Sequence, residues 1–91
     1  MGENLRKHII FYGRVQGVGF RYRAYYSAKN FGLSGWVRNL YDGTVEMEVQ
    51  GREELIHSML KNLNQDHYIR IDHMETEQIP LKQDESGFRV R

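Results

Sequence analysis

The chain has 91 residues, of which 40% are apolar and 27% charged, as in folded globular proteins. It has no cysteine, which excludes disulfides, thiolate catalysis and cysteine-ligated metals. No apolar run approaches the roughly 18 residues of a membrane helix, and residues 1–7 are polar. We therefore expect one domain over residues 1–91, located in the cytoplasm and without a membrane partner.

The charge is distributed unevenly although the formal net charge is only +1. Residues 5–41 contain seven Lys and Arg and no Asp or Glu, whereas residues 42–91 contain six basic and eleven acidic residues. The first half is thus expected to form an anion site. The near-neutral total favours a small anion over nucleic acid. The alternative is solvated surface charge without a function.

Residues 7–12 (KHIIFY) are β-branched and aromatic and predict the first strand. Apolar residues then recur at helical spacing, which predicts a helix over residues 21–31 that ends at a left-handed Gly32. Residues 33–39 (LSGWVRN) predict a second strand, and the Asp-Gly pair at 42–43 predicts a turn.

Residues 44–50 (TVEMEVQ) alternate apolar and polar and predict a third strand with its two glutamates in solvent. Gly51 is expected to break this strand. Apolar residues between 55 and 63 predict a second helix, and residues 68–78 contain a polar strand. Residues 88–90 are expected to form a short closing strand.

The order β-α-β-β-α-β predicts an α+β fold of the ferredoxin-like, or split βαβ, type. In this architecture an antiparallel sheet carries both helices on one face. The first and third strands are central neighbours, and the second strand pairs with the third.

The stretch GRVQGVGFR, residues 13–21, lies between the first strand and the first helix. Glycines there allow main-chain N–H groups to converge on an anion, and the helix N-terminus adds partial positive charge. Arg21 can bind phosphate or carboxylate oxygens in a bidentate manner. No Gly-Lys-Ser/Thr ends the stretch, and Tyr22 stands where a dinucleotide fingerprint needs glycine. The alternative is a structural turn with incidental arginines.

Asn39 by itself is typical of a turn. The predicted topology brings the end of its strand near the loop at 13–21, where its amide could hold a water beside a bound anion. Trp36 is expected in the core. Tyr22, Tyr25 and Tyr26 rim a binding surface or pack on the helix, and Arg14 and Arg23 steer anions or are simply solvated. The four histidines show no metal-ligand spacing and are expected to be structural or on the surface: His8, His57, His67 and His73.

Together the two stretches resemble the acylphosphatase family. The family's first motif, G-x-V-Q-G-V-x-F-R, is matched by residues 13–21. Its second motif is matched by GWVRN at 35–39, GTV at 43–45 and Gly51. One departure, Phe11 where an aliphatic residue is more common, affects nothing catalytic.

The resemblance implies hydrolysis of the carboxyl–phosphate bond of acyl phosphates, without a metal or other cofactor. It implies that Arg21 binds the phosphoryl group together with loop amides and that Asn39 positions the attacking water. The amides are those of Gln16, Gly17, Val18, Gly19, Phe20 and Arg21. Inorganic phosphate would be product and inhibitor, and we expect a monomer with no nucleic-acid partner. The alternatives are an RNA-binding βαββαβ module and a regulator that binds phosphate or acyl phosphate without turnover; the third predicted strand lacks the aromatics of the former.

Overall fold

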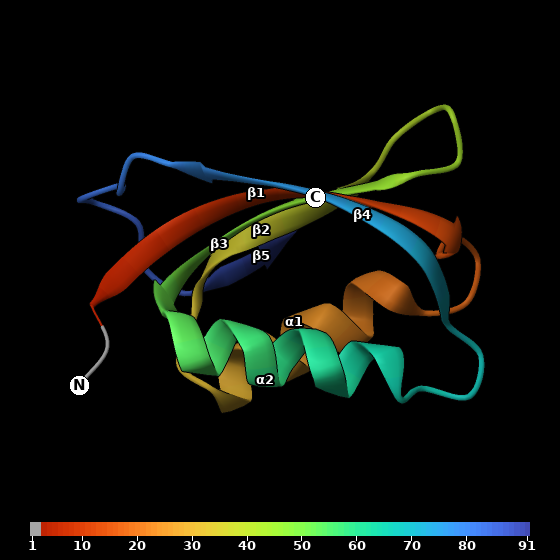
Figure 1. Cartoon of the computed structure of the whole chain (residues 1–91), viewed down its shortest axis with the longest axis horizontal. Coiled ribbons are helices and arrows are strands. Elements are labelled where there is room, and N and C mark those ends of the chain that lie inside the picture. Colours follow the sequence, from red (N-terminus) through yellow and green to blue (C-terminus); the bar gives the residue numbers. More distant parts are fainter. Residues whose placement is uncertain (1–2) are drawn as a thin grey trace.

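A computed structural model describes residues 3–91 and shows a five-stranded sheet with both helices on one face (Figure 1). The elements are β1 (Asn4–Arg14), α1 (Phe20–Asn30), β2 (Ser34–Asn39), β3 (Val45–Arg52), α2 (Glu53–Asn64), β4 (Arg70–Ile79) and β5 (Phe88–Val90). This confirms the predicted ferredoxin-like order, followed by the short closing strand. Neither helix in the described range is long and apolar enough to cross a membrane.

The strands are arranged in the order β4-β1-β3-β2-β5, so β1 and β3 are central neighbours, as predicted. The pairs β1–β3, β1–β4 and β2–β3 are antiparallel, but β5 runs parallel to β2, which makes the sheet mixed. Because β1 and β2 are both antiparallel to β3, their C-terminal ends meet at one end of the sheet. The β1–α1 loop, the β2–β3 turn and the α2–β4 loop all lie at this end (Figure 1).

Two strands extend beyond their predicted limits. β1 begins at Asn4 rather than at residue 7, and β3 continues to Arg52. The prediction that Gly51 breaks the third strand is wrong, because Gly51 pairs with Leu5 inside the β1–β3 ladder. The charged residues at the start of β1 do not prevent pairing, because alternate side chains lie on the face of the sheet that has no helix.

The apolar core lies between the sheet and the two helices. Ile9, Phe11, Val45 and Met47 are fully buried on the sheet side of this core. The Phe11 ring packs on the ring of Phe20, the first residue of α1, with 4.9 Å between centroids. Burial of each such side chain contributes about 1.5–3 kcal/mol. The N-terminus of α1 is therefore fixed relative to β1.

Charged residues on the helix-free face are paired. Arg6 is 1% exposed, and it donates hydrogen bonds to Glu48 at 2.9 Å and to both carboxylate oxygens of Glu85, the shorter at 2.8 Å. His8 contacts Glu46 at 2.7 Å. The expectation that the β3 glutamates face solvent is thus only partly met, since both are half-buried in ion pairs. Glu85 fixes the β4–β5 connection on this face.

Trp36 is buried, but it does not belong to the core between sheet and helices. It lies opposite Glu48 in the β2–β3 ladder, which places it on the helix-free face. The guanidinium groups of Arg38 and Arg91 lie over its ring at 5.4 and 4.4 Å from the centroid. Both guanidinium groups thus make cation–π contacts with the indole.

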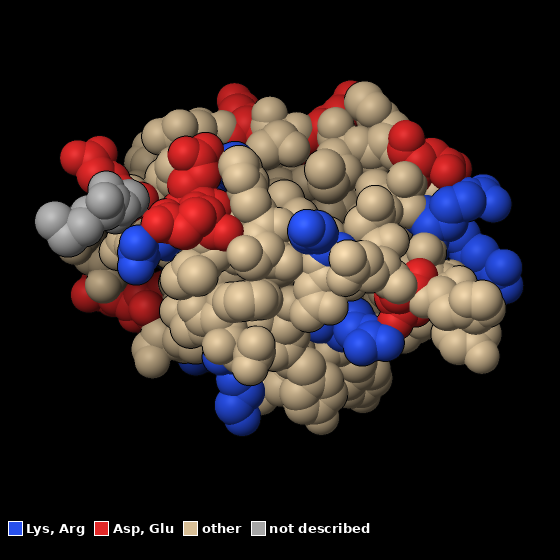
Figure 2. All heavy atoms as spheres, turned by 60° about the horizontal axis from the view of Figure 1, so that its bottom comes forward, with Lys and Arg blue, Asp and Glu red and all other residues tan. Residues whose placement is uncertain are grey.

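Folding neutralises most of the charge imbalance seen in the sequence. Four basic residues of the first half form ion pairs with carboxylates of the second half: Arg6, Lys7, Arg23 and Arg38. On the helix side of the molecule, Lys and Arg side chains are separated by uncharged surface, apart from a small group at the right-hand edge (Figure 2). Arg21 forms no ion pair with an Asp or Glu among residues 3–91. Its charge remains available for an anion.

Candidate active site

The loop between β1 and α1 leads into the N-terminus of α1, and no side chain caps this end of the helix. Gly17 and Gly19 have φ of 72° and 80°, and Gly19 is the residue that precedes α1. A Cβ at either glycine would meet no atom within 4 Å, so there is room for a side chain at both positions. Glycine is favoured there because the backbone is left-handed. The first turn of α1 has no acidic residue, and no side chain caps it. Its main-chain N–H groups therefore offer donors and partial positive charge to an anion.

Arg21 extends from the first turn of α1 toward the last residues of the chain. Its Nη1 donates a hydrogen bond to the main-chain oxygen of Arg91, the last residue of the sequence, at 3.0 Å. The main-chain N–H of Arg91 in turn donates to the carbonyl oxygen of Val37 in β2 at 2.8 Å. These two bonds orient the Arg21 side chain toward the end of the sheet. A guanidinium carries five N–H donors, so others remain for a ligand.

Asn39 is the last residue of β2 and pairs with Val45 of β3. Its side-chain Oδ1 is buried and accepts no hydrogen bond from any residue between 3 and 91. Leaving a buried acceptor unpaired costs about 1–3 kcal/mol. A buried acceptor without a partner in a folded chain requires an explanation, and Asn39 is therefore a candidate functional residue.

Gln16 joins the loop to the β2–β3 turn, a role that the sequence did not indicate. Its Nε2 donates hydrogen bonds to the carbonyl oxygens of Leu40 and Thr44, at 2.6 and 2.8 Å. The glutamine was predicted to contribute its main-chain amide; the structure shows its side chain occupied by the turn. The end of β2 thus approaches the loop, as the predicted topology required. The only sequence signal for this tie is the glutamine in the family's first motif.

Asp42 fixes the β2–β3 turn that Gln16 binds. Its Oδ1 accepts hydrogen bonds from the Thr44 hydroxyl at 2.6 Å and from the Thr44 main-chain N–H at 3.0 Å. These bonds lower the pKa of the Asp42 carboxyl. The carboxylate therefore stays ionised over the physiological range and holds Thr44 in place.

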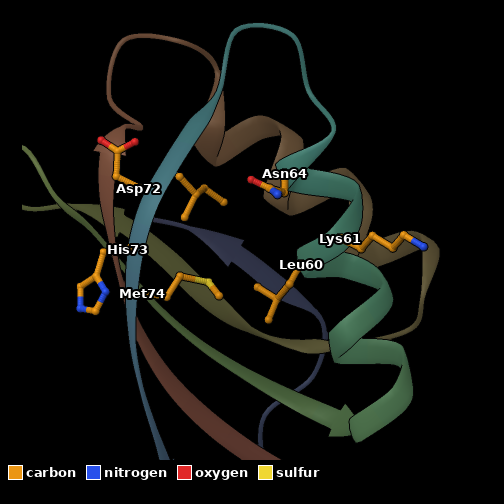
Figure 3. A pocket seen from close by; sticks show the side chains of 7 residues that line it. Leu60, Lys61, Asn64, Asp72, His73 and Met74 are labelled. Atoms are coloured by element: carbon orange, nitrogen blue, oxygen red, sulfur yellow. The ribbon is translucent and has the colours of Figure 1, made fainter.

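Two surface cavities lie at the same end of the molecule. One, of about 410 Å³, lies between α2 and β4, where Leu60 and Met74 point toward each other and His73 points away (Figure 3). It includes none of the predicted site residues. The other, of about 490 Å³, adjoins the loop at Val18 and Gly19.

The described residues contain no group of three or more His, Asp or Glu side chains placed to hold a metal ion. His8 contacts a glutamate on the helix-free face, His73 packs on Tyr12 and His67 packs on Tyr68. The donor set around the loop consists of a guanidinium and N–H groups, which suits an anion rather than a cation.

Comparison with known proteins places this geometry in one family. The sequence model of the acylphosphatase family matches residues 7–90. An acylphosphatase of Geobacillus thermodenitrificans is 43% identical over 86 residues, which cover 93% of this chain and 92% of the relative. The crystal structure of a Bacillus subtilis acylphosphatase superposes with a TM-score of 0.87 at 31% identity, covering 96% of this chain and 98% of that one.

The same fold also occurs inside a much longer protein. The crystal structure of T. kodakarensis HypF matches 96% of this chain with a TM-score of 0.82 and 36% identity, but the match covers 12% of that protein. By the family model and by full-length relatives, the chain belongs to the acylphosphatase family and hydrolyses acyl phosphates.

Proposed function

We propose that Arg21 and the loop amides bind the phosphoryl group of an acyl phosphate and that Asn39 positions the attacking water. The amides are the main-chain N–H groups of Gln16, Gly17, Val18, Gly19, Phe20 and Arg21. One observation carries the proposal: three groups with unused hydrogen-bonding or charge capacity lie at the same end of the sheet. They are the uncapped N–H groups of α1, an arginine that pairs with no Asp or Glu of residues 3–91, and a buried Oδ1 that accepts no hydrogen bond from these residues.

The reaction needs neither a nucleophilic side chain nor a general acid. The oxygen of water attacks phosphorus, and the bond between phosphorus and the carboxyl oxygen breaks with its electron pair on the carboxylate. Because the carboxylic acid has a pKa of about 4, by analogy with side-chain carboxyls, the leaving group departs as an anion. An oxygen of the phosphoryl group accepts the proton of the attacking water. The products are a carboxylate, inorganic phosphate and a proton.

What the protein supplies is position and charge. Phosphoryl transfer is accelerated chiefly by fixed donors directed at the oxygens on which charge resides in the transition state. The Arg21 guanidinium and the N–H groups of the loop fill this role. The side-chain amide of Asn39 holds the attacking water beside phosphorus. This donor set includes no metal ion, so we expect full turnover with a chelator present.

The test is steady-state hydrolysis of acetyl phosphate and benzoyl phosphate, in a chelator, by four proteins: wild type, Arg21→Gln, Asn39→Ala and Arg52→Gln. Arg52 pairs with Glu54 at the start of α2 and serves as the matched arginine control. Removal of one fixed donor lowers kcat by about 10²- to 10³-fold. We expect losses of this size in the first two variants and none in Arg52→Gln.

Inhibition by inorganic phosphate separates the two roles. Arg21→Gln should weaken phosphate inhibition at least tenfold, because Arg21 contacts the anion. Asn39→Ala should keep it, because Asn39 acts on water. Wild-type turnover in Arg21→Gln, or loss of turnover on chelation, would contradict the proposal.

The proposal also takes the enzyme to be a cytoplasmic monomer that acts on small acyl phosphates. The absence of cysteine suits a reducing compartment. Sedimentation equilibrium at assay concentrations tests the monomer, for which the expected mass is 10.8 kDa.

A further inference from the structure

A groove extends from the loop between β1 and α1 along the outer side of α1. It is lined by Val18, Gly19, Tyr22, Arg23, Tyr26, Asp66 and Tyr68. Two of these residues, Val18 and Gly19, belong to the loop itself, so the groove adjoins the loop that is proposed to bind the phosphoryl group. Three are tyrosines with 67%, 63% and 67% of their surface exposed, which is unusual for such large side chains.

The groove and Asn39 lie on opposite sides of the loop. On one side, Gln16 ties the loop to Leu40 and Thr44, directly after Asn39. On the other side, Val18 and Gly19 face the α2–β4 connection, which contributes Tyr68. β2 and β4 are also separated in the sheet by β1 and β3.

Phosphoryl transfer constrains where the leaving group can lie. The attacking and leaving oxygens are roughly in line through phosphorus, so the acyl group points away from the attacking water. With the water at Asn39 and the phosphoryl group in the loop, the acyl group points toward the groove. We propose that this groove is the acyl subsite and that it selects acyl phosphates with an uncharged aromatic acyl group. The inference rests on the proposed function, because it takes the water to be at Asn39.

The chemistry of the lining favours this class of substrate. Tyr22, Tyr26 and Tyr68 offer flat, partly apolar surfaces on which an aryl ring can stack, and the cavity of about 490 Å³ is large enough for one. The two charged residues of the lining, Arg23 and Asp66, are hydrogen-bonded to each other. They leave no uncompensated charge to attract a second carboxylate on the substrate.

Asp66 also fixes Tyr68. Its Oδ1 accepts a hydrogen bond from the Tyr68 main-chain N–H at 2.8 Å. Asp66 therefore holds Tyr68, which forms one wall of the groove, and at the same time pairs with Arg23 on α1. A wall fixed in this way can stack on a ligand with little loss of conformational entropy on binding.

A second groove, on the other flank of α1, is the competing location. It is lined by Tyr22, Tyr25, Tyr26, Phe88, Arg89 and Val90. It lies on the β5 side of the helix, and β5 neighbours β2, which carries Asn39. An acyl group there would lie on the same side as the attacking water. Tyr22 and Tyr26 line both grooves, so Tyr68 and Val90 distinguish them.

The experiment compares kcat/KM for benzoyl phosphate and acetyl phosphate in wild type, Tyr68→Ala, Tyr68→Phe, Val90→Ala and Tyr41→Ala. Tyr41 is the matched control, because it is a fully exposed tyrosine at the same end of the molecule, on the far side of Asn39. Tyr68→Ala should lower kcat/KM for benzoyl phosphate about three- to tenfold, the effect of one aromatic contact, and leave acetyl phosphate unchanged. Tyr68→Phe should restore the preference. Val90→Ala and Tyr41→Ala should behave as wild type.

Two readouts separate the subsite from the proposed function. Inhibition by inorganic phosphate should be the same in Tyr68→Ala and wild type, since only the acyl end is affected. An equal loss for both substrates in Tyr68→Ala, no loss for either, or a benzoyl-specific loss in Val90→Ala instead would overturn the subsite. In each of these cases wild-type hydrolysis of acetyl phosphate would still support the proposed function.

Discussion

Asn39 and Gln16 differ in how their side chains are bonded at the candidate site. The buried Oδ1 of Asn39 accepts no hydrogen bond from any described residue. The side-chain N–H groups of Gln16 both donate to carbonyl oxygens of the β2–β3 turn. Neither side chain is a nucleophile or an acid. Their effects on activity and on stability should therefore differ in a characteristic way.

Asn39→Ala removes the buried oxygen that lacks a donor. We expect the free energy of unfolding to be unchanged or to increase by up to about 1 kcal/mol, because the cost of the unpaired acceptor disappears. This variant should nevertheless be among the least active. Urea unfolding beside the kinetic assay checks it; a loss of stability of more than 1 kcal/mol would mean that Asn39 has a structural role.

Gln16→Ala removes both bonds between the loop and the turn. We expect a loss of about 1–2 kcal/mol in stability, a lower kcat and weaker phosphate inhibition, because the loop amides are no longer fixed. Gln16→Glu is the sharper variant, since a carboxylate of the same shape cannot donate to two carbonyls. It should be at least as impaired as alanine, and wild-type kinetics in Gln16→Glu would exclude the positioning role.

At the level of elements, the helix-free face of the sheet is stabilised by ion pairs rather than by a second layer. The hydrogen bond from Arg6 lowers the pKa of the Glu85 carboxyl, and the Arg6 charge lowers it further. Burial raises the pKa of Glu46, but the hydrogen bonds from His8 and Arg38 outweigh it and the net shift is downward. These carboxylates stabilise the fold only while they are ionised.

This arrangement predicts a pH-dependent contribution from Glu85. Because its pKa is lower in the folded chain than in the unfolded one, its contribution is fully present above the ordinary glutamate pKa of about 4.3. This contribution to stability is lost as the pH falls through the lowered pKa that Glu85 has in the folded chain. The free energy of unfolding of wild type should exceed that of Glu85→Gln by about 1–3 kcal/mol at pH 7. This difference should shrink below about pH 4.

Urea unfolding at pH 7 and pH 3 measures this difference. Glu77→Gln, on the exposed edge strand β4, is the control and should lie within about 0.5 kcal/mol of wild type at both pH values. A difference between wild type and Glu85→Gln that is the same at pH 7 and pH 3 would contradict the role of the Arg6–Glu85 pair.

Much of the element pattern could be predicted from the sequence, because apolar periodicity reports which face is buried. The two helices follow from it, the β2–β3 turn follows from the Asp-Gly pair, and the central position of β1 and β3 follows from the order of the elements. The start of β1 could not be predicted, because Arg6 looks like a loop residue until Glu48 and Glu85 are brought to it from 42 and 79 residues away. The extension of β3 through Gly51 was hidden in the same way, because a glycine looks like a strand end until its partner Leu5 is known.

For the site, the glycines and the charge distribution pointed to the loop and Arg21 as an anion site, and the predicted topology brought Asn39 near them. Only the resemblance to the family implied their roles in the reaction. Local sequence contains no information on the acceptor of Arg21, which lies 70 residues away, or on the carbonyl partners of Gln16. The groove beside the loop was also hidden, because α1 and the α2–β4 connection form it together. The roles assigned to the site residues remain predictions.

At the scale of the whole molecule, ligand binding and stability are linked. Because the loop, β2 and the last residues of the chain meet at one end, phosphate bound there should favour the folded state. At ten times its dissociation constant, phosphate should add about 1.4 kcal/mol, which raises Tm by about 6–10 °C in a domain of this size. Differential scanning fluorimetry should show this shift in wild type and Arg52→Gln but not in Arg21→Gln. An equal shift in Arg21→Gln would place the anion elsewhere.

The turn fixed by Asp42 has a consequence for genetics. Asp42 holds Thr44, and the Thr44 carbonyl is one of the two acceptors that hold Gln16 and, with it, the loop. A random screen for inactive alleles should therefore recover substitutions at Asp42, although this residue stands at an unspecified position of the second sequence motif. Second-site suppressors of such alleles should be found in the β1–α1 loop, far away in sequence but in direct contact with the turn.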